Sequence, residues 1–293
     1  MVTDRRIMND RPIYRGYYDA GGCERHGHTL VAVGVVATVD QWDVFDLRWL
    51  DVLRRCKISS FHMAKIAQWK GDVGQWPLKD GQRDEDRRKE MFVELVKVAS
   101  VVRKVFVRGI VLADYEAMES RYRIGELLGG PYSVAQLACL IQSWEWVRTQ
   151  SDPPPPFQAI VEAGDAGQDR FRRMCEKYLG WVPAFEGKKA PSGEDITPLS
   201  LADLIAYEHN NLYNKRAAGL PVPSREKWRG LTRAVKESLP VDARVIEAGW
   251  LEWLARRRGG LLRAVGDRVF IDAARSFSRS ATASAVARPG CPQ

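Results

Sequence analysis

Two apolar segments near the start of the chain have the pattern of buried β-strands. The first runs from Tyr14 to Asp19 and ends in the glycine turn Ala20 to Gly22, and the second runs from Thr29 to Thr38 and is rich in valine. Since a short polar segment separates them, the pattern predicts that the two strands pair as a hairpin. Three later segments have strand character, the last as a candidate edge strand: 101–112, 157–161 and 181–185.

Apolar residues at helical spacing predict helices between and after these strands. Trp42, Phe45 and Trp49 recur on one face of a helix over residues 42–56, for which Asp40 is the expected N-cap. The same reasoning predicts further helices over 84–100, 132–149, 168–179, 198–211, 224–238 and 244–258. A strand hairpin followed by alternating helices and strands is typical of an α/β fold with a mixed central sheet flanked by helices.

The elements group into one α/β domain with additions at both ends. Residues 1–13 are a charged N-terminal arm, residues 14–212 hold the main strands and helices, and residues 213–276 are expected to form a basic helical extension. Residues 277–293 are rich in Ser, Ala and Arg with little to bury, so we expect a disordered tail.

Charge is distributed unevenly over the 293 residues. The formal net charge is +8, yet residues 1–213 carry 29 Lys and Arg against 30 Asp and Glu, whereas residues 214–293 carry 16 against 7. The basic character therefore belongs to the C-terminal part alone. Such a surface attracts polyanions through counterion release, which points to nucleic acid as a partner, while a solvated basic helix face is the plainer interpretation.

Composition and motifs argue against several classes of protein. No apolar run approaches the roughly 20 residues that a membrane helix needs, and residues 1–15 lack the apolar core of a secretory signal. The five cysteines show no metal-binding spacing, which favours reduced thiols in a cytoplasmic protein. The sequence contains no P-loop and no GxGxxG, so we expect no nucleotide cofactor, and it contains no GxSxG nucleophile motif.

Carboxylates follow two of the predicted strands. Asp19 ends the first strand directly before two glycines, which allow a ligand or a second backbone to come close. Glu162 and Asp165 follow the strand at 157–161 and can turn toward one point, because Gly164 lies between them. The alternative for Asp165 is a cap on the helix that begins near residue 168.

Asp203 is the strongest single candidate. It lies in a helix whose surface is apolar almost all round, and a carboxylate buried there is unfavourable unless it is paired or bound to metal. His62 follows a short extended segment at 58–62 and could bind metal, contact phosphate or transfer a proton, although a lone His is more often packed or exposed.

Carboxylates from separate strands and a helix suit hard, oxygen-seeking cations, so Mg²⁺ or Mn²⁺ is the expected cofactor. Two such ions can stabilise both the attacking and the leaving oxygen when a phosphodiester is cleaved. The predicted chemistry is therefore metal-dependent.

The chain resembles the family catalogued as domain of unknown function 3800, which is grouped with ribonuclease-H-like nucleases. The likeness covers about residues 14–212 and depends on an ordered set of short motifs, none specific alone. The matching stretches are Tyr17–Gly22, Val31–Val36, Trp42 and Trp49, Phe61–Met63, Glu162–Asp165 and Pro198–Glu208.

The resemblance implies a ribonuclease-H-like sheet with acids at one edge. It implies catalytic and metal-binding roles for four acids, with His62 as a fifth catalytic residue; the four acids are Asp19, Glu162, Asp165 and Asp203. Two positions depart from the family. Ala20 and Lys65 stand where many members have acids, and both changes remove negative charge from the expected site.

Two functions follow from these residues. The first is a divalent-metal-dependent nuclease that hydrolyses phosphodiesters of DNA or RNA, motivated by the acids and the basic C-terminal part. The second is a catalytically weak or inactive module of the same fold that binds nucleic acid or protein, motivated by Ala20 and Lys65. Fold alone does not decide between them.

Overall fold

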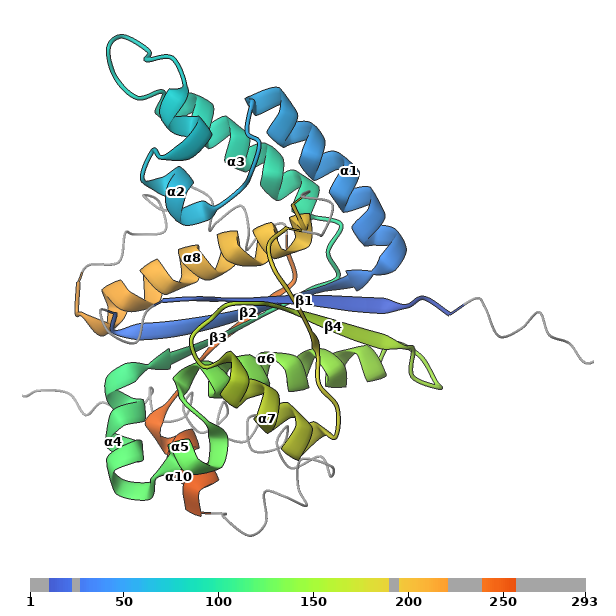
Figure 1. The fold of residues 1–293 in the computed structure, drawn as a ribbon, viewed down its shortest axis with the longest axis vertical. Helices are drawn as coiled ribbons and strands as arrows, with labels where there is room; N and C mark the ends of the chain where they lie inside the picture. The colour runs from blue at the N-terminus through green and yellow to red at the C-terminus, as the bar shows by residue number, and fades with distance from the viewer. Residues whose placement is uncertain (1–10, 23–26, 190–194, 221–238, 257–293) are drawn as a thin grey trace, which may run out of the picture.

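A six-stranded sheet forms the centre of the protein in the computed structural model, which describes residues 11–22, 27–189, 195–220 and 239–256 (Figure 1). The strands lie in the order β5-β4-β1-β2-β3-β6. Their bounds are β1 Tyr14–Gly21, β2 Thr29–Thr38, β3 Lys104–Val111, β4 Phe157–Glu162, β5 Ala184–Glu186 and β6 Val241–Ile246.

Strand directions in the sheet are mixed. β1 and β2 form the predicted antiparallel hairpin, and β3 continues it antiparallel to β2. β4 runs parallel to β1, β5 runs parallel to β4, and β6 runs parallel to β3. Because β1, β4 and β5 are parallel neighbours, their carboxyl ends meet at the same edge of the sheet.

Helices cover both faces of the sheet (Figure 1). One face carries α1 Val39–Cys56, α2 Met63–Ala67, α3 Glu85–Ala99 and α8 Thr197–Ala217, with the short 3₁₀ helix η1 Gly71–Gln75 beside α2. The other face carries α4 Leu112–Tyr122, α5 Ile124–Leu128, α6 Pro131–Arg148, α7 Gln168–Leu179 and α10 Ala248–Arg256. The predicted mixed sheet flanked by helices is confirmed. None of the described helices is both long enough and apolar enough to cross a membrane.

Alternation along β1 decides which side chains face the site. Tyr17 belongs to the core under α1, α3 and α8, whereas Tyr18 belongs to the core under α6 and α7. Since side chains alternate along a strand, Asp19 faces the α8 side with Tyr17. Gly21 then allows α8 to come close, because a Cβ there would lie 3.1 Å from the backbone of Ala206. The expected role of the glycines, close approach of a second backbone, is confirmed.

Helix α1 begins at Val39, and its N-cap lies two residues before the expected one. The N-cap is Thr38 and not Asp40, because the Thr38 hydroxyl accepts from the amide of Gln41 while the Gln41 side chain accepts from the Thr38 amide. This reciprocal pair satisfies two amides that the helix leaves free, which a lone Asp40 in the first turn cannot do.

The C-terminal part differs from its prediction. Residues 241–246 form strand β6 where a helix from Arg244 was expected, and the helix begins only at Ala248. Val241, Val245 and Ile246 are β-branched, and β6 pairs with β3 along six residues. The predicted helix at 224–238 and the tail at 277–293 lie outside the described residues, as do residues 1–10 of the arm.

Arg108 on β3 contributes to the attachment of β6. Its side chain is buried, and Nη1 donates to the main-chain oxygens of Val107 and Asp242, each at 2.7 Å. The same Nη1 lies 3.3 Å from the Asp242 carboxylate. A buried guanidinium therefore finds its counter-ion on the added strand.

Candidate functional site

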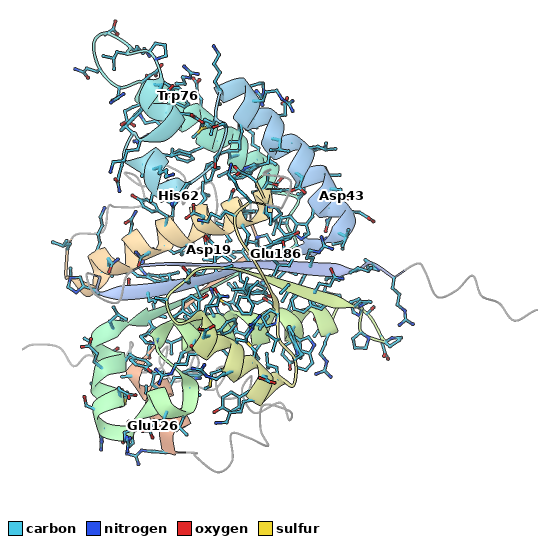
Figure 2. All side chains as sticks on the ribbon, viewed as in Figure 1. Asp19, Asp43, His62, Trp76, Glu126 and Glu186 are labelled. Carbon is cyan, nitrogen blue, oxygen red and sulfur yellow. The ribbon has the colours of Figure 1, made fainter. Side chains whose placement is uncertain are left out.

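Carboxylates from three elements converge where α8 passes over the ends of β1 and β4. Asp19 comes from β1, Glu162 ends β4, and Asp203 lies in α8. In Figure 2, His62 lies on the α2 side of α8 and Asp19 on its sheet side. Parallel pairing of β1 and β4 brings the first two acids to one edge, and α8 supplies the third from above.

The ammonium group of Lys188 lies among the three carboxylates. Its Nζ is 3.3 Å from Glu162 Oε2, 3.4 Å from Asp203 Oδ2 and 3.7 Å from Asp19 Oδ2. Only 4% of the Asp19 side chain and 13% of the Asp203 side chain are exposed. Three of the four predicted acids thus surround the ammonium group of Lys188. We call the group formed by Asp19, Glu162, Asp203 and Lys188 the carboxylate cluster.

Asp203 is the fixed member of the cluster. Its Oδ2 accepts from the amide of Met63 at 2.8 Å and lies 3.2 Å from Nδ1 of His62. Burial would raise the pKa of Asp203, but His62, Lys188 and the Met63 amide outweigh it and hold the pKa below its ordinary value. The structure therefore joins His62 to an ionised Asp203.

Asp19 and Glu162 form the less satisfied half of the cluster. Asp19 Oδ1 accepts from the amide of Ala20 at 2.6 Å, but Asp19 Oδ2 and Glu162 Oε2 are buried without a hydrogen-bond partner. Burial, together with the neighbouring carboxylate of Glu162, raises the pKa of Asp19 well above its usual range. Two facing, unsatisfied oxygens are unfavourable unless a cation lies near them.

Asp165 lies next to the cluster without contacting Lys188 in any described ion pair. Burial, and then the charge of Glu162, raise the pKa of Asp165 to about 6. The alternative interpretation, Asp165 as the cap of α7, is wrong. The N-cap is Gly167, which adopts a φ of +97° and needs no side chain there.

The two positions at which the sequence departs from the resembled family lie on different elements. Ala20 packs with the core on the opposite face of the sheet, because its side chain alternates with that of Asp19. Lys65 is exposed on α2. The Ala20 side chain therefore does not face the three converging acids.

Lys188 is the residue that sequence reasoning missed. It lies in the segment 187–195, whose Lys, Gly, Pro and Ser content is that of a polar loop. Its position follows from β5, which pairs with β4 so that Glu186 lies beside Glu162. The Glu186 carbonyl also accepts from the Ala163 amide at 2.8 Å. The sequence predicts an edge strand at 181–185, but Lys188 can be placed near the acids only when that strand is known to pair with β4.

The donor set fits a divalent cation in kind, whereas its present spacing fits an ammonium. Carboxylate oxygens are the ligands that Mg²⁺ and Mn²⁺ prefer. Asp19 and Glu162 each have a buried oxygen without a hydrogen-bond partner that could act as such a ligand. The oxygens nevertheless lie 3.3–3.7 Å from the central nitrogen, far beyond the roughly 2.0–2.1 Å of a Mg–O bond. Among the described residues, no three acid, His or Cys side chains are arranged as a ready metal site.

A groove of about 600 Å³ lies at the β4–β5 edge of the sheet, and none of the four cluster side chains lines it. Tyr17 lines it from β1, and Trp181 lies at its β5 side. Arg15 also lines it and donates to the Gln158 side chain at 2.9 and 3.1 Å. Residues from both faces of the sheet contribute to this groove, so it is a feature separate from the carboxylate cluster.

Comparisons with known proteins bear on the fold only. No family model and no curated protein matches the chain. The chain is similar to the ribonuclease H2 from Pyrococcus horikoshii OT3, with 13% identity, a TM-score of 0.35, and coverage of 77% of this chain and 98% of that one. It is also similar to a chain in the PCNA:RNase HII complex from Archaeoglobus fulgidus, with 16% identity, a TM-score of 0.36, and coverage of 84% and 90%.

The α/β fold expected from the sequence, a mixed central sheet flanked by helices, is confirmed by the strand order and by helices on both faces. The resemblance to the family of domain 3800 stays a prediction.

Proposed function

We propose that the protein is a divalent-metal-dependent nuclease that hydrolyses phosphodiester bonds at the carboxylate cluster. The observation that supports this proposal is the convergence of Asp19, Glu162 and Asp203 within 3.7 Å of one cationic nitrogen. Like charges repel, so buried acids that face one another need a cation or a shared proton between them. The basic C-terminal sequence would attract the polyanionic substrate.

The side chains divide the work as follows. Asp19, Glu162 and Asp203 would hold Mg²⁺ or Mn²⁺, with Asp165 next to them, and the ion when bound would neutralise charge that develops on the phosphate. The Met63 amide keeps the Asp203 carboxylate in place. Burial of Asp19 keeps water away from the acids and strengthens their hold on any cation.

His62 is the proton-transfer group in this proposal. We assign the Nδ1 proton to the contact with Asp203, which leaves the lone pair on Nε2. The side chain is 41% exposed, so Nε2 can reach a substrate oxygen and exchange protons with water. The Asp203 carboxylate would thus orient the His62 ring, and Nε2 of His62 would accept or donate the proton during hydrolysis.

The first experiment is calorimetric titration of Mn²⁺ into chelator-stripped wild-type protein and into Asp203→Asn. Asn keeps an oxygen for the Met63 amide while removing the charge. We expect micromolar binding in the wild type that is lost in Asp203→Asn and kept in Asp43→Asn, which changes an exposed carboxylate on α1. A screen for cleavage of DNA and RNA with Mg²⁺ or Mn²⁺ follows. No binding and no cleavage with any substrate would refute the proposal.

A second candidate function is a non-catalytic module that binds nucleic acid. The contact of Lys188 with all three acids favours it, because a permanent ion pair needs no metal. This function predicts salt-sensitive binding to nucleic acid that persists in Asp203→Asn, together with the absence of heat when Mn²⁺ is added to the wild type. Cleavage by the wild type would eliminate it.

A further inference from the structure

Lys188 is held by an arrangement that suits a shared cation better than a fixed ion pair. All three N–O distances, 3.3, 3.4 and 3.7 Å, exceed the roughly 2.7–3.2 Å of a good N–H···O hydrogen bond. The ammonium therefore lies between the acids and is not closely bound to any one of them. It takes the central position that a divalent ion would need.

The acids independently require a cation at this place. The Asp19 residue is 2% exposed, and its Oδ2 is directed toward Lys188 without any hydrogen-bond partner. Glu162 Oε2 is buried and unsatisfied in the same way. Without a positive charge among them, these oxygens would be both desolvated and mutually repelled.

The side chain of Lys188 can leave without moving its main chain. The Lys188 carbonyl accepts from the Ile196 amide at 2.8 Å, which ties the backbone to the start of α8. The side chain beyond it is a flexible four-carbon stem and is 25% exposed, so a path to solvent is open. Lys189, its neighbour, is 59% exposed and lies 3.9 Å from Asp195, away from the three acids.

We propose that Lys188 is a displaceable counter-ion: its ammonium and the divalent cation occupy the same place, so that each excludes the other. This inference rests on the proposed function, since it names what must leave before the metal is bound. With Lys188 in place the acids are held together and partly neutralised. For a divalent ion to bind, Lys188 would have to move to the rim of the cluster, and Asp19, Glu162 and Asp203 would then hold the ion in its place.

Chemical labelling of lysine amines tests this exchange on the wild-type protein. The chain is treated briefly with an amine-acylating reagent, with and without saturating Mg²⁺, and the labelling of each lysine is read by mass spectrometry. We expect slow labelling of Lys188 without metal and labelling several-fold faster with Mg²⁺. Lys189 serves as the internal control and should label at the same rate in both. Unchanged or slower labelling of Lys188 with Mg²⁺ would overturn the inference.

Mn²⁺ affinity of two variants gives a second measurement. If Lys188 blocks the site, the apparent Mn²⁺ affinity of the wild type is its intrinsic affinity multiplied by the fraction of molecules in which Lys188 has left the site. If that fraction is about a tenth or less, Lys188→Met should bind Mn²⁺ about tenfold more tightly or better. Lys188→Arg keeps the charge and should bind Mn²⁺ more weakly than the wild type. Lys189→Met should match the wild type. Equal affinities in Lys188→Met, Lys188→Arg and the wild type would contradict displacement.

The two failures can be told apart. If the wild type and Lys188→Met both take up no Mn²⁺, the metal-dependent function fails and the exchange fails with it. If Mn²⁺ binds and is lost in Asp203→Asn while the labelling of Lys188 does not change, the proposed function stands and only the exchange is wrong.

Discussion

Replacing Asp165 with Asn should stabilise the metal-free protein at neutral and alkaline pH. The carboxyl has a pKa of about 6 in the folded protein against an ordinary value of 3.8, because burial and Glu162 disfavour its charge. A difference of about two pH units corresponds to about 3 kcal/mol. The side chain is partly exposed, so solvent reduces this to about 1–2 kcal/mol. Asp165 Oδ2 has no hydrogen-bond partner to lose.

The sign of the effect depends on pH. Below about pH 3.8 the carboxyl of Asp165 is protonated in both the folded and the unfolded chain, and it adds no penalty. Between 3.8 and about 6 the unfolded chain releases the proton while the folded chain retains it, so stability falls as the pH rises. Above about 6 the penalty is constant. Asn never ionises, so the gain should be present at pH 8 and nearly absent at pH 4.

Urea unfolding at both pH values measures this difference. We expect the free energy of unfolding of Asp165→Asn to exceed that of the wild type by about 1–2 kcal/mol at pH 8. Asp152→Asn, at an exposed position, is the control and should shift the free energy of unfolding by less than about 0.5 kcal/mol. Destabilisation at pH 8, or the same gain at pH 4 as at pH 8, would refute the assigned charge penalty.

Two predictions concern the scaffold. Trp49→Ala removes a fully buried ring that stacks 5.0 Å from Phe45, so it should cost about 3–5 kcal/mol in urea unfolding, and a cost below about 1 kcal/mol would contradict the described core. Asp242→Ala leaves the buried Arg108 without its counter-ion and should lower the free energy of unfolding by about 3 kcal/mol. The double variant Arg108→Met with Asp242→Leu should recover most of this stability. A double variant as unstable as the single one would show that the unpaired charge is not the cause.

Much of the site could be predicted from the sequence, because its carboxylates stand in or next to apolar elements where an unpaired charge is unfavourable. Asp203 lies in a helix that is apolar almost all round, and only a functional or paired carboxylate tolerates that setting. Asp19 and Glu162 end strands that are recognisable from their own composition. Parallel pairing of β1 and β4 then brings them to one edge of the sheet. Local sequence thus identified each acid, whereas acids at one edge were implied only by the family resemblance.

The parts that were missed depend on contacts between distant segments. Lys188 looks like an ordinary loop lysine until β5 is placed beside β4. Val241 to Ile246 becomes a strand because β3 offers an open edge and a buried Arg108 that needs Asp242, and neither fact is visible within the segment itself. Asp165 was grouped with the other acids by its spacing from Glu162 and by the family resemblance, yet no described ion pair joins it to Lys188.

Pairing of β3 with β6 also sets the order in which the molecule can be completed during synthesis. Val105 pairs with Val241, so β3 gains its second neighbouring strand only after most of the chain has left the ribosome. The segments that carry Asp19, Glu162 and Asp203 emerge earlier and can assemble on β1, β4 and α8 while β3 is still an open edge. Such an edge is a template for pairing with another chain. A nascent chain therefore passes through a period in which its acidic centre is built while the apolar strand β3 is the open edge, until β6, which carries Asp242 and Arg244, replaces β3 as the edge strand.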